Sequence, residues 1–173
     1  MASAFGHASH GPALRGHARF GALPPTRRLA VAGQAARYLG AVSILLVGAV
    51  HAQQYYEAYF YAVPTIGTLF LLSFIGAGVV GVTLLAPVRR LGQPLGDVIL
   101  VLSALGGIGI ALGTLVSLLI SEYTPLFGFM ESGYRLAVDL TLLFDGMTTI
   151  FLGFFLLVFA QRLLRPSTLD DGR

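Results

Sequence analysis

The sequence contains no cysteine, no tryptophan and no lysine, and it is poor in charge of either sign. The lack of cysteine excludes disulfides and thiolate metal sites. Without tryptophan, an aromatic belt at a membrane surface would have to use tyrosine and phenylalanine. Charged residues make up 11% and hydrophobic residues 55% of the chain, whereas soluble domains carry about 25% charged residues. A chain of this size could not hide so much apolar surface from water, which predicts an integral membrane protein.

Four apolar stretches are long enough to cross a bilayer, which takes roughly 20 residues of helix. The first apolar run is short, so its helix is expected to continue through His51 to about residue 60. Pro64 suits the first turn of the second helix, and Pro87 ends it. The expected fold is an all-α, four-helix transmembrane bundle with up-down-up-down topology. Its spans are predicted at about 38–60, 64–86, 98–120 and 136–160.

The first 36 residues differ from the rest of the chain. Residues 1–36 are rich in Ala, Gly, Pro and Arg, and they contain no acidic residue and no sustained period. Such a segment cannot bury enough apolar area to fold alone, so a disordered basic cytoplasmic tail is expected. The transmembrane domain then covers 37–165, and 166–173 form a polar cytoplasmic end. A secretory signal over 1–52 is the alternative, but the region before the apolar run is long and contains proline.

The arginines set the expected orientation. Ten of the 11 basic residues lie before the first span, in the connection after the second span, or after the fourth span; Arg135 alone lies on the other side. The positive-inside rule therefore places both termini in the cytoplasm. Six of the seven tyrosines lie at the opposite, outer boundary, a depth that amphipathic rings favour. We expect a multi-pass membrane protein with both termini in the cytoplasm.

Small residues recur every four positions in the third span, at Ser103 and Gly107 and, separately, at Gly109, Gly113 and Ser117. This spacing lets helix backbones approach closely. We expect a neighbour in the same chain, with a homodimer or a larger membrane complex through this stripe as the alternative. The GxGxxG pattern at 76–81 lies inside an uncharged apolar span, so it predicts helix packing rather than a dinucleotide site, which needs a preceding strand.

The fourth span carries a costly residue, Asp145, about eight residues and so roughly 12 Å inside its outer end. A carboxylate in lipid is disfavoured by at least about 2.5 kcal/mol, so Asp145 should face the bundle interior. His51 lies at a comparable depth in the first span, and first and fourth spans are usually neighbours in such bundles. We therefore predict one intramembrane polar cluster of His51, Tyr55, Thr141, Asp145, Thr148 and Thr149.

Three interpretations of this cluster stay open. The favoured one is a hydrogen-bonded pair that fixes helix register, and the second is a proton- or ligand-handling site. The third is a metal or haem at His51. A haem would need a dimer, because one histidine per chain cannot supply two axial ligands, and no cofactor and no metal are expected. Four further acidic residues are expected at the outer face, where such groups are usually solvated: Glu57, Glu122, Glu131 and Asp139.

Part of the sequence resembles a known group. Gly48-x-x-His51-x-x-x-Tyr55, followed by the run VPTIGTLFLL at 63–72, resembles uncharacterised small four-span bacterial integral membrane proteins. The segment LFGFME at 126–131 is similar to the outer loop of that group, and the overall layout is similar to DoxX-like proteins. Residues 60–62 depart from the pattern, because a basic residue is expected there. The resemblance implies the fold and a location in a bacterial cytoplasmic membrane, and it transfers no catalytic role.

The sequence contains no nucleophile–base pair, no phosphate loop and no nucleic-acid signature. We therefore expect a structural or accessory membrane subunit rather than an enzyme. A carrier or redox-associated protein that uses His51 and Asp145 for protons or a small ligand is the alternative. Transport usually needs a continuous polar path or broken helices, and only one cluster is visible.

Overall fold

The computed structural model describes residues 24–125 and 136–164. Four long helices make up most of this part: α1 (Pro25–Glu57), α2 (Ile66–Leu85), α3 (Leu95–Tyr123) and α4 (Leu136–Leu163). Short 3-10 turns, η1 (Phe60–Ala62) and η2 (Val88–Leu91), follow α1 and α2, and the described ranges contain no strand. All four helices are long and apolar enough to cross a membrane. The predicted all-α four-helix membrane bundle is confirmed.

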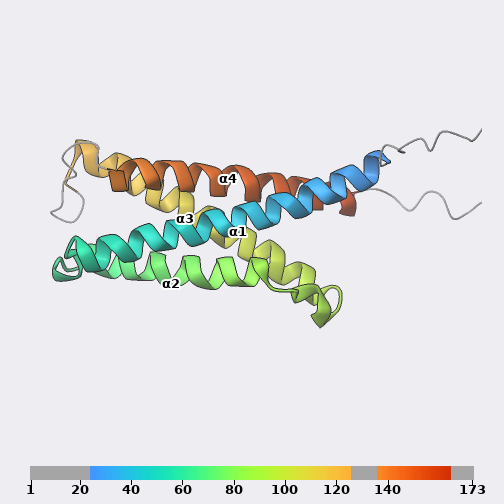
Figure 1. The fold of residues 1–173 in the computed structure, drawn as a ribbon, viewed down its shortest axis with the longest axis horizontal. Coiled ribbons are helices and arrows are strands. Elements are labelled where there is room, and N and C mark those ends of the chain that lie inside the picture. The colour runs from blue at the N-terminus through green and yellow to red at the C-terminus, as the bar shows by residue number, and fades with distance from the viewer. Residues whose placement is uncertain (1–23, 126–135, 165–173) are drawn as a thin grey trace, which may run out of the picture.

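Consecutive helices run antiparallel, and α1 packs along both α2 and α4 (Figure 1). α3 packs on α4 and more lightly on α2, and it barely touches α1. Two ends of the bundle can be distinguished. At the η1 end lie the end of α1, η1 and the start of α2; at the η2 end lie η2 and the start of α3. The start of α1 extends along the last turns of α4 beyond the η2 end (Figure 1).

The closest helix packing lies toward the η2 end and depends on glycines. A Cβ added at Gly81 of α2 would lie 2.5 Å from Leu45 of α1, and one at Gly107 of α3 would lie 2.7 Å from Leu152 of α4. Gly40 of α1 faces the same leucine, so Leu152 is enclosed from two sides and has no exposed surface. Small residues thus let large apolar side chains fill the space between backbones.

Helix α1 begins at Pro25, 13 residues before residue 38, where the first span was predicted to begin. The expectation that the tail lacks regular structure through residue 36 is therefore wrong for 25–36, while residues 1–23 lie outside the described residues. Pro25 opens the helix, as proline can in a first turn. Gly33 then approaches Val158 of α4, and Ala36 and Arg37 are buried. Packing of small residues against α4, rather than a hydrophobic period, explains this extension.

The connection from α1 to α2 is longer than predicted, because the helix does not continue to residue 60. α1 ends at Glu57, and α2 begins at Ile66 instead of Pro64, with Tyr59 and Thr65 in positive-φ conformations (61° and 67°). Gly67 is needed here, because a Cβ would come within 2.5 Å of the carbonyl oxygen of Phe60. η1 therefore folds back onto the first turn of α2. This places the Phe60 ring stacked on Phe70, with centroids 5.0 Å apart.

Candidate ligand cavity between the four helices

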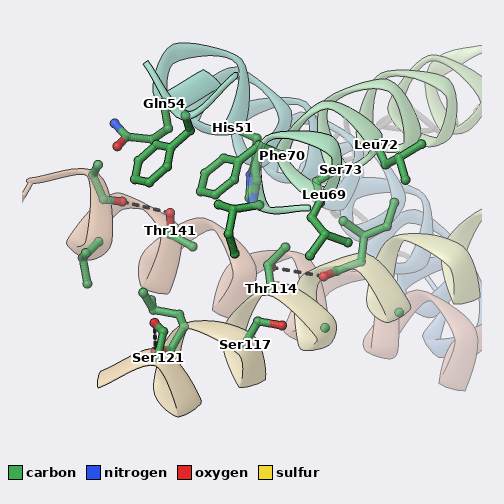
Figure 2. Close-up of a pocket in the computed structure, with 18 residues that line it drawn as sticks. His51, Gln54, Leu69, Phe70, Leu72, Ser73, Thr114, Ser117, Ser121 and Thr141 are labelled. Carbon is green, nitrogen blue, oxygen red and sulfur yellow. Dashed lines mark hydrogen bonds between the residues drawn. The ribbon is translucent and has the colours of Figure 1, made fainter. Parts of the chain in front are cut away.

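The η1 half of the bundle contains a cavity of about 420 Å³. Sites for small molecules usually have volumes of about 300–1,000 Å³. All four helices contribute to the wall, and Figure 2 shows the side chains facing the space between them. The polar residues of the wall are His51 and Gln54 from α1, Ser73 from α2, Thr114, Ser117 and Ser121 from α3, and Thr141 from α4. The rest of the wall is apolar.

The cavity exists because two residues of α3 that line it, Gly109 and Gly113, have no side chain. A Cβ built at Gly109 or Gly113 would have no heavy atom within 4 Å. Helices α2 and α3 do touch nearer the η2 end, where a Cβ built on Gly107 would lie 3.2 Å from Val80 of α2. The expected tight packing within the chain is therefore right for Gly107 but wrong for Gly109 and Gly113. At the latter two positions, the missing side chains leave open space instead.

The cavity opens through the side of the bundle, between α2 and α3. Gly109, Gly113 and Ser117 are exposed along its edge. On the facing helix, Leu69 and Leu72 are 42% and 59% exposed although both line the cavity. These residues lie within helices long and apolar enough to span a membrane. In a bilayer this side opening faces lipid chains rather than water.

His51 forms the α1 wall of the cavity and is only 6% exposed. Its Nδ1 lies 2.9 Å from the carbonyl oxygen of Val47. A carbonyl oxygen can only accept, so Nδ1 carries a hydrogen and donates it. The ring packs against Phe70 at a centroid distance of 5.1 Å, and Phe70 in turn stacks on Phe60. These contacts fix the ring, while no residue within 24–125 or 136–164 forms a hydrogen bond with Nε2.

Asp145 lies behind the inner end of the cavity, with 1% of its surface exposed. The Thr114 hydroxyl, on the cavity wall, donates to Asp145 Oδ2 at 2.6 Å and so connects α3 to α4. The other carboxylate oxygen, Oδ1, is buried without a hydrogen bond, as is Oγ1 of Thr148 one turn away. Thr149 donates to the backbone oxygen of Asp145 rather than to its side chain. The prediction that Asp145 faces the bundle interior is confirmed.

The structure places the members of the predicted polar cluster in different settings. His51 and Thr141 both line the cavity, but Asp145 does not. No hydrogen bond joins His51 to Asp145, and Tyr55 packs on Tyr56 and Tyr61 instead of on His51. α1 and α4 run antiparallel with Gly40 opposite Leu152, which puts Asp145 level with Val47. His51 therefore lies one turn, about 6 Å along the axis, closer to the η1 end.

The cavity residue that sequence reasoning missed most clearly is Thr114, which connects the buried carboxyl to the cavity. A threonine in an uncharged span carries little signal of its own. Its partner could be inferred only with the register of α3 against α4, where Gly107 faces Leu152. Ser73 and Gln54 were missed for the same reason, because their roles depend on the cavity rather than on a motif.

The predicted outer acidic residues do not converge. Glu57 is exposed and accepts a hydrogen bond from Gln53 Nε2 at 3.1 Å. Asp139 is exposed near the start of α4, Glu122 is half-buried on α3, and Glu131 lies outside the described residues. Over 24–125 and 136–164, no group of three or more His, Cys, Asp or Glu side chains is placed to hold a metal ion.

Comparisons with known proteins provide no relative from which a function could be transferred. The chain matches no protein-family model, no curated protein and no solved structure. What can be said of function therefore rests on the cavity and its wall.

Proposed function

We propose that this membrane protein binds a small lipophilic molecule in the cavity and exchanges it with the bilayer through the opening between α2 and α3. The observation that carries the proposal is the cavity itself: about 420 Å³, mostly apolar, and open sideways beside Gly113 and Leu72. Ligand sites are typically apolar hollows with a few placed polar groups. The wall around His51, Thr141 and Ser121 has this composition.

The cavity favours this function over the structural role expected from the sequence. Protein interiors are normally packed to crystal-like density, and a void loses the contacts that its lining atoms would make. A polar pair that only fixed helix register would gain nothing from the space beside Gly109 and Gly113. His51 and Asp145 also lack the direct hydrogen bond that such a pair requires.

The arginines support an orientation for this function. In the described part, Arg27, Arg28 and Arg37 lie in the first half of α1, Arg89 and Arg90 in η2, and Arg162 near the end of α4. All six belong to the η2 end, which the positive-inside rule assigns to the cytoplasm. The cavity, in the η1 half, then lies in the outer leaflet of a bacterial cytoplasmic membrane. A ligand from that leaflet would reach the opening without crossing the membrane.

An accessory role in a homodimer or larger complex is the second candidate. It is favoured by the exposure of Gly109, Gly113 and Ser117, because small residues four apart are a common helix-pairing surface in membranes. A partner helix on this stripe would close the cavity. Ligand exchange with the bilayer thus requires this surface to be uncovered, whereas the accessory role requires a partner helix to cover it.

The test compares bound molecules in three proteins by native mass spectrometry after gentle extraction from the membrane. The variant Gly113→Leu places a side chain in the cavity, and Gly153→Leu is its matched control: a Cβ at either glycine meets no atom within 4 Å, but Gly153 does not line the cavity. Wild type and the control should carry a non-covalent lipophilic adduct that Gly113→Leu lacks. Equal adducts in all three proteins, or none in wild type, would overturn the proposal.

A further inference from the structure

Three polar side chains of the cavity wall already donate their hydrogens to backbone carbonyl oxygens. Because Nδ1 of His51 donates to Val47, the neutral ring presents Nε2 to the cavity as an acceptor. The Thr141 hydroxyl donates to the carbonyl of Ala137 at 2.8 Å, and the Ser121 hydroxyl donates to that of Leu118 at 2.7 Å. Each hydroxyl has a single hydrogen, so their oxygens are also left as acceptors. The fixed polar atoms of the cavity therefore require a donor.

The wall also excludes a charged head group. No Arg, Asp or Glu is among the lining residues in the part of the chain that the structure describes. Asp145 is the nearest buried acid, and it is separated from the cavity by Thr114. A charge without a partner inside a membrane protein is costly. Among the described residues, a phosphate, carboxylate or ammonium group would find no counter-charge beside His51.

The position of His51 gives the ligand a direction. The ring lies on α1, across the cavity from α3, and is itself buried. The exit lies along the exposed Leu69, Leu72 and Gly113, which offer only apolar contact. A polar head would therefore lie inside, against His51 and Thr141, and an apolar chain would extend through the opening toward the lipid.

From this arrangement we infer that the ligand is a neutral amphiphile, an alcohol or phenol with an apolar chain, whose hydroxyl donates a hydrogen bond to His51 Nε2. The inference rests on the proposed function and adds to it the chemistry of the head group. It assigns His51 as a specificity-determining residue, because its ring favours a head group that can donate a hydrogen bond over one that cannot.

The test uses a long-chain alkylphenol and its methyl ether, which share a chain but differ in the ability to donate. Binding to the full chain in lipid nanodiscs is measured by titration calorimetry, with empty nanodiscs subtracted. The wild type should bind the phenol roughly tenfold more tightly than the ether, because the ether leaves a buried acceptor unpaired. In His51→Phe, which keeps a ring against Phe70, this ratio should fall toward one. In Thr83→Ala, which removes a hydroxyl outside the cavity that donates to Val79 of its own helix, the ratio should persist.

The outcomes separate the two proposals. If wild type binds phenol and ether equally, and Gly113→Leu abolishes both, the cavity function stands and the inference about a donor is overturned. If the ratio survives in His51→Phe, or is lost equally in Thr83→Ala, the assignment of His51 is wrong. If neither probe shows saturable binding to wild type, the proposed function fails, and the inference fails with it.

Discussion

The hydrogen bond between Thr114 and Asp145 should contribute measurably to stability. Among the described residues it is the only side-chain hydrogen bond that joins two of the four long helices. Double-mutant cycles in membrane proteins give about 0.6 kcal/mol on average and at most about 1.7 kcal/mol for such bonds. The 2.6 Å distance and the burial of Asp145 favour the upper part of this range. The coupling energy is lowered by alternative acceptors, because the Thr114 hydroxyl can donate instead to the carbonyls of Ile110 or Ala111, at 3.1 and 3.0 Å.

We therefore expect a coupling free energy of about 1 kcal/mol between Thr114→Val and Asp145→Ala. The four proteins of the cycle would be unfolded reversibly in mixed micelles by titration with sodium dodecyl sulfate. Thr83→Val is the control partner for Asp145→Ala, because Thr83 donates only to Val79 of its own helix; that pair should be additive. Additivity of the Thr114 and Asp145 changes to within about 0.5 kcal/mol would refute the reasoning.

Three further outcomes are expected in the same unfolding assay. Gly40→Ala should destabilise the protein by about 1–3 kcal/mol, because its Cβ would overlap the fully buried Leu152; Gly153→Ala, with open space, should be neutral or stabilise by up to about 1 kcal/mol. Gly67→Ala should also destabilise, since its Cβ would meet the Phe60 carbonyl oxygen at 2.5 Å, and it should weaken alkylphenol binding by displacing η1 from the cavity wall. Arg89→Ala should change stability by less than about 1 kcal/mol, because the ion pair with Asp97 is partly exposed. A large loss in Arg89→Ala, or none in Gly40→Ala, would contradict the packing described.

The four helices were predictable because their apolar runs are bounded by prolines and arginines. The start of α1 was not, because it is held by small residues rather than by a hydrophobic stripe. Gly33 and Ala36 fit closely against α4, and a sequence rich in Ala and Gly looks the same whether it packs or stays solvated. The difference lies in the partner, Val158, which is more than a hundred positions away in the chain.

The candidate site was also predictable only in part. The cost of a carboxylate in lipid sufficed to predict that Asp145 points inward. Which residue it contacts depends on helix register, and the glycine contacts with Leu152 set that register. The cavity could not be predicted at all. Small residues at a spacing of four permit close packing at Gly107 and open space at Gly113, and only the side chain opposite decides between them.

The measurement that bears most directly on the ligand cavity is the environment of the open edge of α3 in a bilayer. Because the chain has no cysteine, Ser117→Cys introduces a single site for a nitroxide label. Electron paramagnetic resonance in nanodiscs should find this label accessible to oxygen dissolved in lipid, shielded from a water-soluble nickel complex, and without a defined distance to another label. A label shielded from both relaxants, with one sharp distance to a second label, would show that another copy of the chain covers the opening.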